Sequence, residues 1–184
     1  MRTRTRLAVG VISGALALVA CSGDGGRVPP RAYAQRICAS MQAYIDDVTT
    51  LSTDFAAQIN PASTLEEQKE GVLGFLDDVL VATDRLIVGV GRAGIPDVDG
   101  GEGIVGAIEE TFGEARDVLE SAKAQVETIP VDDAEAFAAQ LDEIGTSIQT
   151  SLGGIGGSLQ RLDSPELAEA VQAEPSCRAV GAVA

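Results

Sequence analysis

The pattern of apolar and polar positions divides most of this chain into long amphipathic segments. From Arg31 onward, apolar residues return every three or four positions, which is the spacing of one face of an α-helix. This pattern predicts four long helices and a short fifth one, at about 31–59, 65–92, 104–129, 132–162 and 164–174. We therefore expect an all-α domain over 31–184.

Capping and helix-breaking residues coincide with the predicted boundaries. Asn60-Pro61 stops the first helix. Thr64 followed by Glu67 is the signature of a capping box at the start of the second helix. Gly94 follows the end of that helix, and Pro165 suits the first turn of the short one.

Long helices joined by short connections are typical of an antiparallel up-down four-helix bundle. Each long helix would extend about 40 Å at 1.5 Å per residue. In that topology the first helix begins, and the fourth ends, at the same end of the bundle. We therefore expect the short fifth helix and the chain after it to lie beside the start of the first helix.

A different pattern precedes the helices. Three arginines in the first six residues are followed by an apolar run over 7–20 and then by Cys21. The sequence Leu18-Val19-Ala20-Cys21 resembles a bacterial lipobox. The resemblance implies export by the general secretory route, cleavage before Cys21 and a diacylglyceryl group on its sulfur, with palmitate-type acyl chains.

The resemblance divides the chain into a signal peptide (1–20), a flexible tether (21–30) and a helical domain (31–184) at the outer face of the cytoplasmic membrane. An uncleaved membrane helix and an ordinary secretory signal are the alternatives. The apolar run is shorter than the roughly 20 residues that span a bilayer, and an A-x-A-like cleavage pattern is lacking. The composition, poor in lysine and rich in alanine, glycine and valine, resembles that of actinobacterial proteins.

The remaining cysteines predict a disulfide. If Cys21 carries lipid, Cys38 and Cys177 form an even pair in an oxidising compartment, where a structural disulfide is the usual outcome. The bundle topology brings the same two residues to one end, so the two predictions support each other. Two separate buried thiols are the alternative.

Charge excludes one class of partner. Removal of the signal peptide leaves 10 Lys and Arg against 28 Asp and Glu, a formal charge of −18. Nucleic acid binding depends on clustered basic residues, so we expect none. An anionic membrane surface also repels such a domain, and attachment must therefore come from the lipid.

The chain contains no histidine, which removes the usual general base, the Ser-His-Asp arrangement and histidine metal ligands. The acidic loop 97–102 has oxygen ligands, but its register does not match a calcium loop, because Glu102 stands where that loop needs glycine. Paired acidic residues elsewhere are adjacent on helices, where neighbouring side chains diverge. We expect no catalytic residue, no metal site and no cofactor.

Glycines in the fourth helix suggest one candidate site. The glycines there cost the helix roughly 3 to 4 kcal/mol relative to alanine, and the bundle arrangement sets them opposite two large side chains of the first helix. The candidate pocket consists of Met41, Tyr44, Gly153, Gly154, Gly156 and Gly157. A small apolar pocket or hinge is one interpretation, and close helix packing is the other.

These observations together favour a membrane-anchored, non-catalytic protein that binds an envelope protein or a small apolar ligand. A structural component of the cell envelope is an alternative, and an enzyme is a third.

Overall fold

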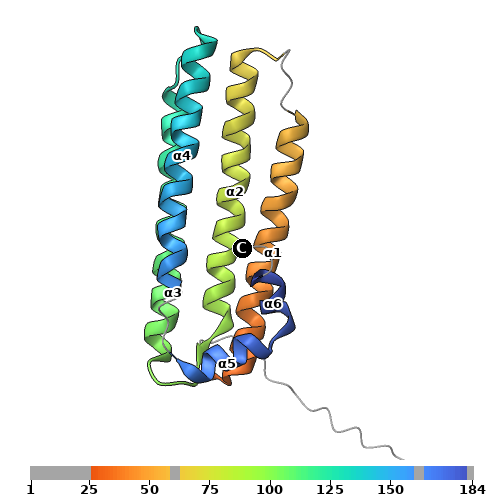
Figure 1. The fold of residues 1–184 in the computed structure, drawn as a ribbon, viewed down its shortest axis with the longest axis vertical. Helices are drawn as coiled ribbons and strands as arrows, with labels where there is room; N and C mark the ends of the chain where they lie inside the picture. The colour runs from red at the N-terminus through yellow and green to blue at the C-terminus, as the bar shows by residue number, and fades with distance from the viewer. Residues whose placement is uncertain (1–25, 59–62, 160–163, 182–184) are drawn as a thin grey trace, which may run out of the picture.

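The helices stand side by side as a bundle in the computed structural model, which describes residues 26–58, 63–159 and 164–181, with backbone alone for 152–159, 179 and 181 (Figure 1). The elements in chain order are β1 (Arg27–Val28), α1 (Pro30–Gln58), α2 (Leu65–Ala93), β2 (Ile95–Pro96), α3 (Gly101–Thr128), α4 (Ala134–Leu159), α5 (Pro165–Ala173) and α6 (Pro175–Gly181). The expected all-helical class is confirmed, with one minimal pair of strands added to it.

Local sequence accounts for several helix ends. Thr64 Oγ1 accepts a hydrogen bond from the Glu67 backbone N–H at 3.2 Å, and the Thr64 N–H donates to Glu67 Oε2 at 2.8 Å. The predicted capping box is thus present at the start of α2. Asp133 Oδ1 accepts from two backbone N–H groups in the first turn of α4, and Ser164 Oγ accepts from Leu167 N–H at the start of α5.

Two elements differ from the sequence prediction. Helix α3 begins at Gly101, earlier than expected, after Gly100 in the left-handed region with φ 73°. Gly101 also packs so closely on the Pro96 carbonyl oxygen that a Cβ would overlap it. Pro175 ends α5 as expected but also opens α6, because proline fits the first turn of a helix.

The strand pair ties the incoming chain to the α2–α3 connection. β1 and β2 are parallel, with Arg27 opposite Ile95. Ile95 N–H donates to the Gly26 carbonyl at 3.3 Å, and Asp97 N–H donates to the Val28 carbonyl at 2.8 Å. The last residues of the predicted tether are therefore part of the folded domain.

Helix α1 packs along α2, α2 along α3 and α3 along α4, and the α5–α6 segment packs on α1. Arg36 of α1 donates to the Ala93 carbonyl at 3.1 Å, and near the other end of the pair Phe55 stacks on Phe75. In the described ranges α1 makes no extensive contact with α4. The space beside the first half of α1 is occupied by α5 and α6 instead (Figure 1).

The core has two parts. The disulfide-end core contains buried side chains of α1, α2, α3, α5, α6 and the β2–α3 connection, namely Tyr33, Ala34, Ile37, Cys38, Leu86, Val90, Ala93, Val98, Ile104, Ile108, Leu167 and Cys177. The distal core joins α2, α3 and α4 through Leu76, Val79, Leu80, Leu119, Ala122, Val126, Ile129, Phe137 and Ile144. Both are almost entirely aliphatic, as the scarcity of aromatic residues requires.

Candidate functional site

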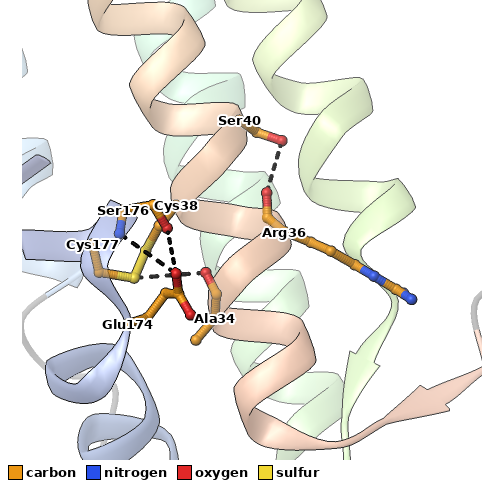
Figure 2. The surroundings of a disulfide bond; sticks show 7 residues. All are labelled: Ala34, Arg36, Cys38, Ser40, Glu174, Ser176 and Cys177. Carbon is orange, nitrogen blue, oxygen red and sulfur yellow. Dashed lines mark hydrogen bonds between the residues drawn. A yellow bond between two sulfur atoms is a disulfide. The ribbon is translucent and has the colours of Figure 1, made fainter. Parts of the chain in front are cut away.

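The disulfide joins α1 to α6 at the end of the bundle where the described chain begins (Figure 2). Cys38 and Cys177 are buried, and their Cα atoms lie 4.9 Å apart. The Cys177 sulfur also lies 3.6 Å from the Ala34 carbonyl oxygen. A bridged sulfur has no proton, so this is a packing contact. The predicted pairing of the two cysteines is confirmed.

A buried carboxylate lies beside the disulfide and organises the start of α6. Glu174 is 9 % exposed, and its Oε1 accepts hydrogen bonds from Ser176 Oγ at 3.1 Å and Ser176 N–H at 3.5 Å (Figure 2). Negative charge is favourable at this position, because the first N–H groups of a helix are unpaired and its dipole is positive there. Glu174 thus holds the Cys177 segment in the conformation that docks on α1.

The acidic loop 97–102 faces a counter-ion. Arg27 lies 3.8 Å from Asp97 and 3.6 Å from Glu102, measured between guanidinium nitrogen and carboxylate oxygen. Among the residues that the structure describes, no three His, Cys, Asp or Glu side chains are grouped so that they could hold a metal ion. The carboxylates of the loop therefore form ion pairs with Arg27, which lies on β1.

The disulfide-end core also buries the phenol of Tyr33. This side chain is 1 % exposed, and its hydroxyl has no hydrogen-bond partner among the described residues. Burial disfavours the charged phenolate and raises the pKa of Tyr33 to about 12, and the carboxylate of Glu109 contributes to that rise. The phenol is accordingly neutral, and its unpaired hydroxyl opposes folding.

The candidate pocket predicted from the sequence is described only in part. Met41 and Tyr44 are half-buried and pack against the disulfide-end core. The four glycines belong to the last turns of α4, and their surroundings lie outside the described part of the chain: Gly153, Gly154, Gly156 and Gly157. The pocket remains a prediction.

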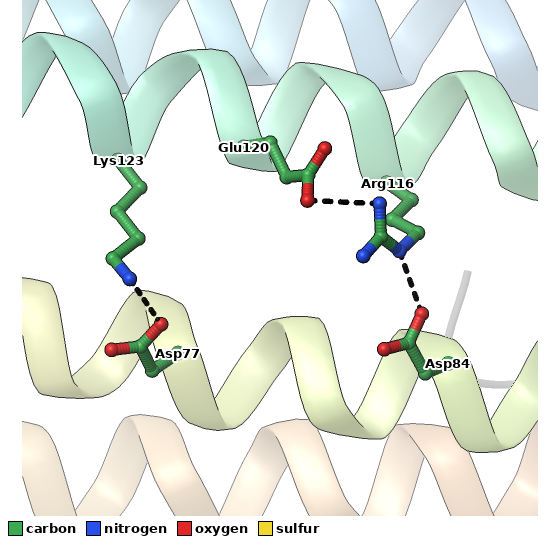
Figure 3. A network of polar contacts seen from close by, with 5 residues as sticks. All are labelled: Asp77, Asp84, Arg116, Glu120 and Lys123. Carbon is green, nitrogen blue, oxygen red and sulfur yellow. Dashed lines mark hydrogen bonds and ion pairs between the residues drawn. The ribbon is translucent and has the colours of Figure 1, made fainter.

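An ion-pair network connects α2 to α3 (Figure 3). Lys123 Nζ lies 2.6 Å from Asp77, Arg116 Nε lies 2.7 Å from Asp84, and Arg116 Nη1 lies 2.9 Å from Glu120. The hydrogen bond to Asp84 is the main reason that the pKa of Arg116 is raised, and the one to Asp77 raises the pKa of Lys123. Two of the few basic side chains in this chain are thereby committed to helix pairing.

A second surface, which the sequence analysis did not identify, runs along the seam between α1 and α2. We define the α1–α2 groove by the residues that line three adjoining hollows: Asp47, Thr50, Leu51, Asp54, Phe55, Gln58, Ser63, Glu67, Gln68, Glu70, Gly71, Gly74, Phe75, Asp78, Val81, Ala82 and Arg85. The central hollow has a volume of about 240 Å³ and shares Phe55 with one neighbour and Leu51 with the other. The feature of the sequence that indicates this groove is the pair Gly71 and Gly74, because two glycines three positions apart leave one face of a helix without side chains.

The rings of Phe55 and Phe75 stack in the central hollow with centroids 4.8 Å apart and planes inclined at 26°. A Cβ on Gly71 would lie 4.0 Å from the Phe55 ring, and a Cβ on Gly74 would meet nothing within 4 Å. Gly71 therefore faces the Phe55 ring, and Gly74 opens onto free space in the same hollow. The lining of this hollow combines aromatic rings with carboxylates.

None of the helices in the described ranges is long and apolar enough to cross a membrane. The disulfide lies toward the end of the bundle where the chain enters (Figure 1). The acidic α1–α2 groove runs from Asp47 and Arg85 to the opposite end, where α1 stops and α2 starts. No family model, no curated protein and no solved structure matches this chain.

Proposed function

We propose that this protein is a lipid-anchored, non-catalytic binding protein at the outer face of a bacterial cytoplasmic membrane, where it binds another envelope protein. The observation that carries the proposal is the lipobox-like sequence Leu18-Val19-Ala20-Cys21, placed five residues before Gly26, where the described domain begins. A diacylated cysteine gives stable attachment, because each buried methylene contributes about 0.8 kcal/mol and two chains act together.

The position of the domain on the membrane follows from the tether. Five residues span at most about 18 Å when fully extended. Because Arg27 and Val28 are paired with the α2–α3 connection, the disulfide end of the bundle would be the end held near the bilayer. The opposite end, with the α1–α2 groove, would then project toward the partners in the envelope.

The proposal includes an antiparallel up-and-down arrangement of the four long helices. The contact of Arg36 with Ala93 and that of Phe55 with Phe75 support it, because residue numbers rise along α1 while they fall along α2. Lys69 supports it for α2 and α3, since its Nζ donates to the Glu127 carbonyl at 2.8 Å.

Binding is favoured over catalysis by the composition. A chain without histidine lacks the commonest general base at neutral pH. The half-buried Met41 and Tyr44 favour a second candidate, a small apolar ligand at the predicted pocket. Uptake of a lipophilic dye, compared with that of Gly154→Leu and Gly156→Leu, tests this second candidate, and unchanged uptake in both variants would end it.

The experiment for the anchor is metabolic labelling with an alkyne fatty acid in an actinobacterial host. The wild-type chain should incorporate label and remain in the membrane fraction. Cys21→Ser should lose both properties, while Cys38→Ser, the matched control, should keep the label. A wild-type chain whose mature N-terminal cysteine has an unmodified mass would overturn the proposal.

The experiment for the partner is crosslinking in intact cells followed by purification of the lipidated chain. One envelope protein should be recovered in stoichiometric amount. It should no longer be recovered with a variant in which the surface of the α1–α2 groove is changed. Recovery of the chain alone, or with bound lipid and no protein, would contradict partner binding.

A further inference from the structure

The α1–α2 groove carries carboxylates that form no ion pair within the part of the chain that the structure describes. Asp54, Glu70 and Asp78 line the central hollow, and no Lys or Arg of the described chain lies within ion-pair distance of them. Arg85, at one end of the groove, is paired with Asp47 at 3.4 Å. The central hollow is therefore complementary to an incoming positive charge.

The floor of the central hollow is complementary to the same kind of group. Lysine and arginine side chains have an apolar stem and a charged head, and they place the stem on apolar surface while the head stays in a polar environment. The stacked rings of Phe55 and Phe75 supply that surface, and an aromatic face also attracts a cation. Leu51 extends the apolar floor along α1.

The shape of the groove indicates a chain segment as its occupant. The three hollows adjoin one another along α2 from Glu67 to Arg85, which is about 27 Å at 1.5 Å per residue. An extended segment of about eight residues covers that length. A single small cation would use only the central hollow.

We propose that the α1–α2 groove binds an extended segment, rich in lysine or arginine, of a partner protein. A basic side chain of that segment lies on Phe55 and Phe75, and its charged head lies among Asp54, Glu70 and Asp78. This deepens the proposed function, on which it rests for the location at the membrane, and names the chemistry of the partner. Binding weakens as salt rises, because the carboxylates are at the surface and are screened.

The test uses the mature chain as it is exported, purified in detergent, and a fluorescein-labelled octapeptide of alternating arginine and glycine. Fluorescence anisotropy at physiological salt measures the Kd. The groove variant Asp54→Asn/Glu70→Gln/Asp78→Asn should raise the Kd at least tenfold. The matched control removes the same charge from exposed carboxylates of α3 and α4 and should change the Kd less than twofold: Asp117→Asn/Asp142→Asn/Glu143→Gln.

A second pair of variants fills space without changing charge. Gly74→Leu adds a side chain to the lining of the central hollow, whereas Gly113→Leu adds the same side chain to α3, and neither Cβ meets an atom within 4 Å. Gly74→Leu should raise the Kd at least fivefold and Gly113→Leu should leave it unchanged. Circular dichroism melting curves confirm that each variant is folded.

Several outcomes would overturn the inference. Equal weakening by the two charge variants would mean that the net charge alone attracts the peptide. An unchanged Kd for Gly74→Leu would exclude the central hollow as the place where the peptide binds. If spermine binds as tightly as the peptide, and if the charge variant of the groove and Gly74→Leu weaken its binding to the same extent, the occupant is a free polyamine. The same peptide-binding measurement can be made with the unlipidated Cys21→Ser chain. A negative result for the lipid anchor would therefore leave the peptide-binding result unchanged, and the two proposals are tested independently.

Discussion

Removal of the disulfide is the most informative perturbation of this fold. The double variant Cys38→Ala/Cys177→Ala deletes the bond and leaves no buried hydroxyl in its place, as serine would. The bond joins residues 139 positions apart, so it restricts nearly the whole domain in the unfolded state. We expect the free energy of unfolding to fall for the global transition, rather than for α6 alone.

The magnitude follows from the length of the closed loop. The chain-entropy model gives roughly 5 kcal/mol for a loop of about 140 residues, and measured values for disulfides are commonly about 2 to 4 kcal/mol. The docking of α5 and α6 on α1 also relies on apolar burial of Leu167, which the variant keeps. We therefore expect a loss of about 3 to 5 kcal/mol.

Urea denaturation followed by circular dichroism measures this loss. With a urea dependence of about 2 kcal/mol per molar, the midpoint should fall by about 2 M. Reduction of the wild-type chain by a thiol should reproduce the shift. The double variant should not respond to the thiol, which provides the control.

A loss below about 1 kcal/mol would refute the reasoning, because it would mean that the bond restricts little in the unfolded chain. A separate early transition confined to 164–181, with an unchanged main transition, would also refute it. In that case the bond would only hold α5 and α6 in place.

Three further predictions concern single side chains. The pKa of Tyr33 is about 12 in the folded chain and about 10 in the unfolded one, so the free energy of unfolding should fall by about 3 kcal/mol as pH rises from about 10 to 12. In denaturation measured across that pH range, Tyr33→Phe should remove this fall, and the control Tyr44→Phe should keep it. Gly101→Ala should destabilise the domain by about 1 to 3 kcal/mol, because its Cβ meets the Pro96 carbonyl, whereas a melting curve of Gly103→Ala should be unchanged or slightly raised. Thr64→Ala should cost about 1 kcal/mol of stability in urea, through loss of the capping box, and an unchanged midpoint would show that the tertiary contacts of α2 alone set its start.

Local signals explain which elements could be predicted from the sequence. Helix α2 has a capping box at Thr64 and glycine at position 94, so both of its ends are encoded within a few residues. The cysteine pair was predictable from its even number and from the expected topology. Helix α6 was not, because a proline ends one helix and opens another with equal ease, and only docking through Cys177 decides between them.

Non-local contacts explain what the sequence could not show. Strands of two residues have no periodicity, and β1 forms only because the bundle brings Arg27 beside Ile95. The α1–α2 groove depends on which way Gly71 and Gly74 face, and that is fixed by the packing of α2 on Phe55 of α1. The unpaired hydroxyl of Tyr33 could not be predicted for the same reason, since a helical pattern of apolar residues does not show which polar side-chain atoms are buried.

If Cys21 carries the proposed lipid, the short strand pair determines how a mechanical load on that anchor enters the domain. A pull on the tether acts along β1, so it shears the hydrogen bonds to Gly26 and Val28 together rather than opening them one after another. The force passes to the α2–α3 connection and to the start of α1, which the disulfide fastens to α6. On the proposed anchoring, the disulfide-locked end of the bundle would bear this load, and the opposite end would keep its shape.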